Sequence, residues 1–261
     1  MIDMLKEVWR YRYVVVVQTW ATLRASNVNT RLGPLWWFFE PLAMMFVYYF
    51  VLHTMMGRGG PGYHVFVLSA LIVWKWFSQS VSQSAGTFVR NRNLILQVRF
   101  PLLCLIVAPI LANLFHTLLG VAVVLLFALR VPGLELLYLV PLFLVQFLFT
   151  LGLSVLVSIV NVYVRDLEHS LSAILRAWWF LSPVLYDVSL VLESDRVPEF
   201  AKTLFMLNPL ATLLPAYRGV LLDGVAPDMA AVGACGAVSL VLVLLGTALL
   251  QAQQRVIPKM I

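Results

Sequence analysis

Residues that could do chemistry are few in this chain of 261 residues, and they lack the patterns that catalysis needs. The four histidines stand apart without the HExxH spacing of a zinc site, and no glycine-rich loop ends in the Lys-Ser or Lys-Thr pair that binds nucleotide phosphates. The acidic residues form no paired cluster for acid–base work. We therefore expect no catalytic residue, metal site or cofactor in this chain, and no nucleic acid as a partner.

Charged residues inside apolar runs give a stronger signal. Glu40, Lys75 and Arg176 each interrupt a stretch that is otherwise uncharged. A lone charge in hydrocarbon costs on the order of 2.5–3.5 kcal/mol, so each needs a partner or water. Counted from the same membrane face, Glu40 and Lys75 lie at depths of about 9 Å and about 12 Å. The spacing predicts a buried Glu40–Lys75 ion pair, and the alternative is that each faces a hydrated channel separately.

The composition shows what must position these residues. Apolar residues make up 62% of the chain and charged residues 11%, against about 45–50% and about 25% in soluble domains. This composition excludes a soluble enzyme, a disordered chain and a fibrous protein. We expect an all-α polytopic membrane protein. Apolar runs long enough to cross a bilayer predict six transmembrane helices, at residues 34–56, 63–86, 101–129, 136–164, 168–186 and 229–254.

Three further segments do not fit a spanning helix. Residues 2–24 are amphipathic, with Trp and Tyr on one face and basic residues elsewhere, which predicts a helix lying flat at the membrane interface. A first spanning helix is the alternative. Residues 88–100 form a short basic turn, and residues 187–218 hold a short apolar stretch broken by prolines, which is typical of a re-entrant hairpin.

Basic residues gather on one side of this predicted topology. With six spans both termini share a side, and the positive-inside rule makes that side cytoplasmic, so that the 187–218 hairpin faces outward. The eleven basic residues on this side are Lys6, Arg10, Arg12, Arg24, Arg31, Arg90, Arg92, Arg99, Arg165, Arg255 and Lys259.

Four motifs occur in an order that resembles a known family. They are NTRLGPLWWFFEPL at 29–42, NRNLILQVRFP at 91–101, RDL at 165–167 and NPLATLLPAYRGVLL at 208–222. Together they resemble the permease subunit of bacterial polysaccharide ABC exporters, the type-2 exporter family that handles O-antigen, teichoic acid and capsule. The likeness covers nearly the whole chain.

The resemblance implies a homodimer bound to two copies of a separate ABC ATPase, which holds the ATP and Mg²⁺. The cargo would be a polysaccharide on undecaprenyl diphosphate, exported from the cytoplasm across the bacterial plasma (inner) membrane. The basic turn at 88–100 would then be the ATPase-coupling segment, although anchoring to membrane lipids explains its charges equally well. Its candidate coupling residues are Arg90, Arg92, Leu94, Ile95 and Arg99.

Candidate cargo residues follow from the same resemblance. Arginine matches phosphate oxygens well, so the diphosphate candidates are Arg24, Arg31 and Arg176, with lipid anchoring as the alternative for the first two. Ring faces pack on sugars, so the channel candidates are Trp178, Trp179 and Tyr186, with an interfacial aromatic belt as the alternative. The outward hairpin would be centred on Asn208, Pro209, Tyr217 and Arg218.

Two rival functions remain. A permease of the same fold could export drugs or other lipids, and the sequence does not separate it from a polysaccharide exporter. An integral-membrane enzyme acting on polyprenol-linked sugars would need clustered acidic or histidine residues, which the sequence lacks.

Overall fold

The computed structural model describes residues 7–25, 35–129 and 133–261, and in these ranges the chain is helical without a β-strand. The longer helices are α2 (Arg12–Ala25), α3 (Trp36–Tyr48), α4 (Tyr63–Ala85), α7 (Leu103–Phe127), α8 (Leu139–Tyr163), α9 (Leu167–Phe180), α12 (Pro209–Arg218) and α13 (Met229–Gln253). The short helices are α5 (Thr87–Arg90), α6 (Arg92–Gln97), α10 (Ser189–Leu192), α11 (Glu199–Met206) and α14 (Ile257–Met260). Two π-helices, η2 (Tyr49–Met55) and η4 (Gly219–Asp223), extend α3 and α12, and the 3₁₀-helix η3 (Leu134–Tyr138) precedes α8.

Five of the described helices are long and apolar enough to cross a membrane. They are Trp36–Met55, Tyr63–Ala85, Leu103–Phe127, Leu134–Tyr163 and Met229–Gln253. The pair Glu199–Met206 and Pro209–Asp223 meets the same test only when it is taken as one span with a 69° bend. These helices confirm the predicted all-α polytopic membrane protein.

The fifth predicted span, 168–186, differs from the prediction. Its helix α9 ends at Phe180 and has 14 residues, which is about 21 Å and too short to cross alone. Pro183 explains the early end, because a proline disfavours helical geometry in the residue before it. The stretch nevertheless follows the full length of α4. Glu168 pairs with Arg90 just past one end of α4, and Leu185 O accepts a hydrogen bond from Tyr63 at the other.

Helix α4 is the centre of the bundle and contacts α3, α7, α8, α9 and α12. Polar side chains join it to its neighbours: Trp76 Nε1 donates to Ile110 O at 3.1 Å, and Gln146 Nε2 donates to Val73 O at 3.0 Å. Such bonds hold membrane helices together where lipid removes the hydrophobic drive for association. The α8–α13 pair instead relies on close approach, because a Cβ on Gly152 would lie 2.8 Å from Leu242 Cβ.

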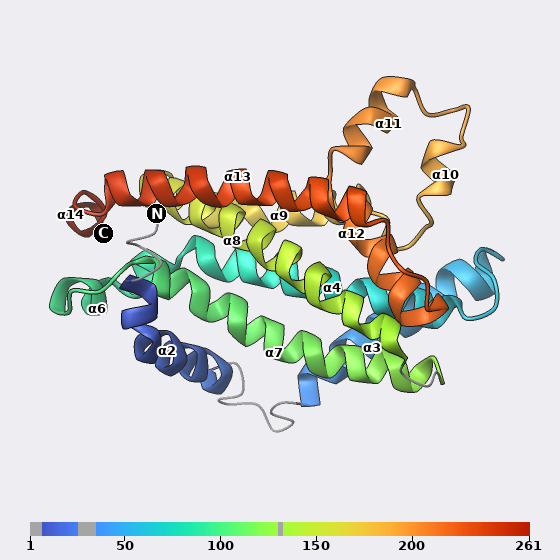
Figure 1. The fold of residues 1–261 in the computed structure, drawn as a ribbon, viewed down its shortest axis with the longest axis horizontal. Coiled ribbons are helices and arrows are strands. Elements are labelled where there is room, and N and C mark those ends of the chain that lie inside the picture. The colour runs from blue at the N-terminus through green and yellow to red at the C-terminus, as the bar shows by residue number, and fades with distance from the viewer. Residues whose placement is uncertain (1–6, 26–34, 130–132) are drawn as a thin grey trace.

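The two ends of the bundle differ in charge. At one end, on the left of Figure 1, α6 and α14 project past the ends of α4 and α7 together with the C-terminus. We call it the basic end, because Arg92 and Lys259 belong to these helices and Arg90, Arg99 and Arg255 lie within two residues of them in the sequence. The opposite, distal end holds the turn at 57–62, where Gly57, Gly59 and Gly62 adopt positive φ angles that favour glycine. The α10–α11 segment projects sideways from the bundle (Figure 1).

Helix α2 packs along α7 and buries Val15 against it. The aromatic side chains Tyr13 and Trp20, and Trp9 just before the helix, point away from the bundle and are all more than half exposed. The predicted amphipathic face is therefore turned outward, toward what surrounds the protein. That the helix lies flat at the interface stays a prediction.

Candidate functional site

Glu40 and Lys75 meet on the surface of the bundle. The short turn at 57–62 makes α3 and α4 antiparallel neighbours, and Lys75 Nζ lies 2.6 Å from Glu40 Oε2. The ammonium also lies 4.8 Å from the centroid of the Trp37 ring, a cation–π contact. The sequence predicted that this pair is buried, but the Glu40 side chain is 55% exposed and that of Lys75 is 16% exposed. On the single chain the carboxylate therefore faces outward from the bundle.

The exposed carboxylate belongs to a groove between α3, α4 and α9, which we call the lateral groove. It has a volume of about 290 Å³ and is lined by Glu40, Pro41, Met44, Tyr48, Leu71, Trp74, Lys75, Ser78, Gln79 and Trp179. The rings of Tyr48 and Trp179 lie 5.2 Å apart. The groove thus combines two charged groups, two hydroxyls, an amide and aromatic rings. Such a set offers hydrogen bonds and apolar contact to a polyhydroxylated molecule.

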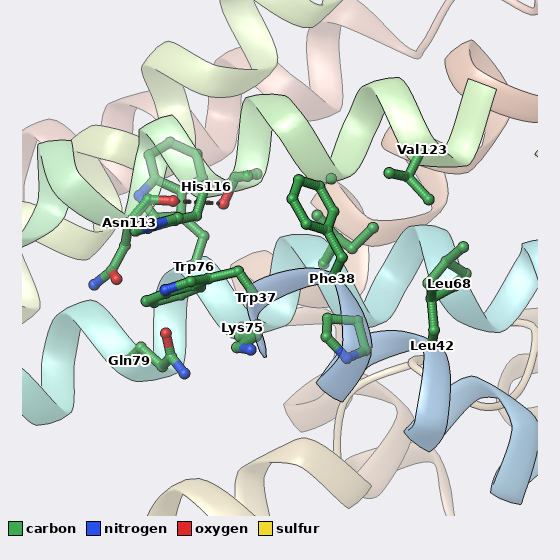
Figure 2. A pocket seen from close by; sticks show the side chains of 14 residues that line it. Trp37, Phe38, Leu42, Leu68, Lys75, Trp76, Gln79, Asn113, His116 and Val123 are labelled. Carbon is green, nitrogen blue, oxygen red and sulfur yellow. Dashed lines mark hydrogen bonds between the residues drawn. The ribbon is translucent and has the colours of Figure 1, made fainter. Parts of the chain in front are cut away.

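A small pocket between α3, α4 and α7 shares Pro41, Lys75 and Gln79 with the groove (Figure 2). Its volume is about 30 Å³, enough for a single water. The Trp37 ring stacks on His116, with centroids 3.5 Å apart, and Asn113 Nδ2 donates to Ser80 Oγ at 3.1 Å. Among the residues that the structure describes, no hydrogen-bond partner lies within reach of the buried atoms Gln79 Oε1 and His116 Nδ1.

Sequence reasoning missed this polar pocket, although a signal was available. Asn113 and His116 are one helical turn apart in an uncharged span, and Gln79 lies one turn beyond Lys75. Polar residues at helical spacing in a span indicate a polar stripe that faces other helices. The charged pair and this stripe therefore form one polar region across α3, α4 and α7.

The structure places the predicted diphosphate arginines on separate elements. Arg24, in the last turn of α2, is exposed with its guanidinium 6.0 Å from the Trp20 ring. Arg176 is exposed on α9, and its Nε donates to Ser172 O within the same helix. Arg31 lies outside the described residues. The contacts of Arg24 and Arg176 are thus local to their own helices.

The three predicted channel aromatics occupy different surroundings. Trp178 points into the bundle, where its Nε1 donates to Asn208 Oδ1 at 3.1 Å and its ring contacts Phe77. Trp179 lines the lateral groove, and Tyr186 lines a cavity of about 1080 Å³ at the distal end. Trp179 is thus the member of the trio that shares a surface with Glu40.

The predicted hairpin residues hold α12 in place. Asn208 caps α12 by accepting from Leu210 N, and its Nδ2 donates to Ser182 Oγ at 2.9 Å. Pro209 takes the first helical position, which needs no N–H. At the other end Arg218 is 4% exposed and donates to three carbonyls, Phe66 O, Tyr186 O and Val184 O. Tyr217 is fully buried. These side chains bind the hairpin to α4 and to the segment after α9.

Three of the five candidate coupling residues are held within the chain, and the other two are exposed. Arg90 is bound within the chain: Nη1 lies 2.6 Å from Glu168 Oε1, and Nη2 donates to Gln83 O. Leu94 and Ile95 are half-buried and pack toward the bundle. Arg92 and Arg99 are exposed. The apolar side chains that α6 and its flank expose are Leu96 and Val98, at 54% and 50%, rather than the predicted pair.

A helical bundle of spanning length with a charged, aromatic groove on one flank defines the chain as an integral membrane protein with a polar lateral face. The model of the ABC-2 type transporter family matches residues 14–222, and the chain belongs to this family. Its activity is therefore transport rather than catalysis.

Three curated relatives are similar over most of their length. The O-antigen export system permease protein RfbA of Myxococcus xanthus is 30% identical over 258 residues, covering 97% of each chain. Two proteins of the same name from Klebsiella pneumoniae are each 29% identical and cover 81% of both chains.

Proposed function

We propose that this chain is the transmembrane subunit of an ATP-driven exporter that moves a polysaccharide, linked to undecaprenyl diphosphate, from the cytoplasm across the bacterial plasma membrane. The observation that carries the proposal is the likeness to O-antigen export permeases, which extends over 97% of the chain in one case. The basic end faces the cytoplasm in this proposal, and both termini lie there.

The lateral groove supports a cargo path on the α3–α4–α9 face. An exposed carboxylate at membrane depth is costly in lipid, so this face is expected to contact protein or water rather than lipid. The low burial of α3 supports the same conclusion, because Pro41 is the one buried residue among its thirteen. In the proposed homodimer two such faces enclose a hydrated path, and the groove's rings and polar groups bind successive sugars weakly enough to release them.

In this proposal, ATP hydrolysis by a partner protein drives the export. The sequence has no phosphate-binding loop, so the proposal assigns ATP and Mg²⁺ to two copies of a separate ABC ATPase that dock at the basic end. Arg92 and Arg99 are exposed there. Arg90 acts differently, since its bonds to Glu168 and Gln83 O fix the segment to α9 and α4.

The lipid-linked diphosphate is expected to meet arginines on its way to the path. Arg24 is exposed at the end of α2, shortly before Arg31 in the sequence, and Arg176 is exposed on α9. Each would contribute a planar fork of donors to phosphate oxygens. Anchoring to membrane lipids remains the rival role of Arg24 and Arg31.

Depletion of the protein in its native cell tests whether the cargo is a polysaccharide. The proposal expects lipid-linked polysaccharide to accumulate on the cytoplasmic side and to disappear from the surface, and expression of the chain should restore it. A Trp179→Ala variant should export less polysaccharide, whereas Phe200→Ala on the projecting α11 should not. If depletion leaves the surface polysaccharide unchanged but removes resistance to a drug or transport of a lipid, the chain belongs to the rival permease class.

A further inference from the structure

The C-terminal segment packs against the proposed coupling segment. Ile257, at the start of α14, is fully buried, and it belongs to one apolar cluster with Leu94, Ile95 and Ile261. Helix α14 contacts both α6 and α8. Two segments that are about 160 residues apart in the sequence thus form one unit at the basic end (Figure 1).

This unit presents a single surface, which we call the α6–α14 surface. Its exposed apolar side chains are Leu96, Val98, Val256 and Met260, which are 39–54% exposed. Its exposed basic residues are Arg92, Arg99, Arg255 and Lys259. Neither 91–99 nor 254–261 contains an acidic residue. The surface is therefore cationic with an aliphatic component, and it extends past the ends of α4 and α7.

We infer that the C-terminal residues 254–261 form part of the docking surface for a cytoplasmic protein with an acidic, apolar-floored groove, and that α14 also fixes the position of α6 beneath that partner. The inference rests on the proposed function, in which the partner is the ATPase subunit. Charge complementarity selects an acidic groove. The surface is connected through the chain to two spans. Helix α14 follows the last span, α13, after three residues, and α6 follows α4 through the short helix α5.

The exposed side chains favour a protein over lipid as the occupant. Lipid interfaces enrich Trp and Tyr, and α2 exposes Tyr13 and Trp20 in that way, with Trp9 exposed just before the helix. The α6–α14 surface exposes aliphatic side chains and a methionine instead, and methionine adapts well to protein surfaces. The two cytoplasmic elements are thus suited to different partners.

Charge reversal tests the inference on the full chain co-expressed with its ATPase. Arg255→Glu combined with Lys259→Glu should weaken copurification roughly tenfold or more, because like charges then oppose the partner's acidic groove. Both residues are exposed, so the folded yield should be unchanged. Arg58→Glu combined with Arg196→Glu is the matched control of equal charge at exposed sites, and it should leave copurification unchanged.

A parallel variant separates this inference from the proposed function. Arg92→Glu with Arg99→Glu should weaken the complex if any ATPase docks at α6. Loss with that pair but none with the C-terminal pair would overturn the role of 254–261 and leave the ATPase proposal standing. Loss with neither pair would overturn both. If the C-terminal pair keeps the ATPase but reduces binding to anionic lipid vesicles, the surface is a lipid anchor and the inference is wrong.

Discussion

At the scale of single residues, Glu40 shows what an apolar sequence does and does not disclose. The depth argument matched Glu40 with Lys75, and their charged atoms are 2.6 Å apart. The exposure of the carboxylate was not predictable, because residue depth along a span says nothing about which way a side chain points around the helix. The ion pair of Arg90 was not predictable either, because its partner Glu168 is 78 residues away in the sequence.

Removal of one charge of this pair should be worse than removal of both. Glu40→Gln leaves the Lys75 ammonium without its carboxylate, with the Trp37 ring still in contact, and Lys75→Met leaves the Glu40 carboxylate without its ammonium. The double variant leaves neither charge at this site. We expect each single change to lower the folded yield and the thermal midpoint in lipid nanodiscs more than the double change does.

The Glu199–Lys202 pair on the projecting α11 is the control; its charged atoms are 2.8 Å apart and the Glu199 side chain is 87% exposed. Its single variants should change stability by less than about 1 kcal/mol. Losses that simply add in the Glu40–Lys75 double variant would show that the two charges do not interact.

At the scale of elements, uncharged runs bounded by Gly and Pro predicted the long spans well. The predicted ranges 63–86, 101–129 and 229–254 correspond to Tyr63–Ala85, Leu103–Phe127 and Met229–Gln253. Hydropathy did not indicate that α9 would end at Phe180, shortly before Pro183, that η2 would be a π-helix, or that α11 would project sideways.

Two helix caps in the same region allow a matched test. Asp228 Oδ1 accepts from Ala230 N and Ala231 N at the start of α13, and its removal by Asp228→Ala should cost about 1 kcal/mol. Asn208→Ala removes a cap and also the partners of Trp178 and Ser182. Leaving the half-buried Trp178 indole N–H without its acceptor adds about 1–3 kcal/mol. Unfolding in mild detergent should rank Asn208→Ala as the more damaging change, and equal losses would argue against its bridging role.

At the scale of the whole molecule, the arrangement of charge predicts the orientation in the membrane. Arg92, Arg99, Arg255 and Lys259 share the basic end, and basic loops stay in the cytoplasm. In a variant with Cys104 and Cys235 replaced, a cysteine at Lys259 should react with an impermeant maleimide only after the cell is opened. A cysteine at Gly60, in the distal turn, should react in cells whose plasma membrane is intact. The reverse pattern would invert the proposed topology.

The separation of Glu40 and Lys75 along the chain also bears on how the protein enters the membrane during synthesis. Glu40 emerges from the ribosome 35 residues before Lys75, so the first span reaches the insertion machinery with a carboxylate that has no counter-charge yet. A turn as short as 57–62 keeps that interval brief and delivers α4 directly beside α3. The two spans are therefore expected to leave the insertion channel for lipid together, as a helical hairpin, rather than one after the other.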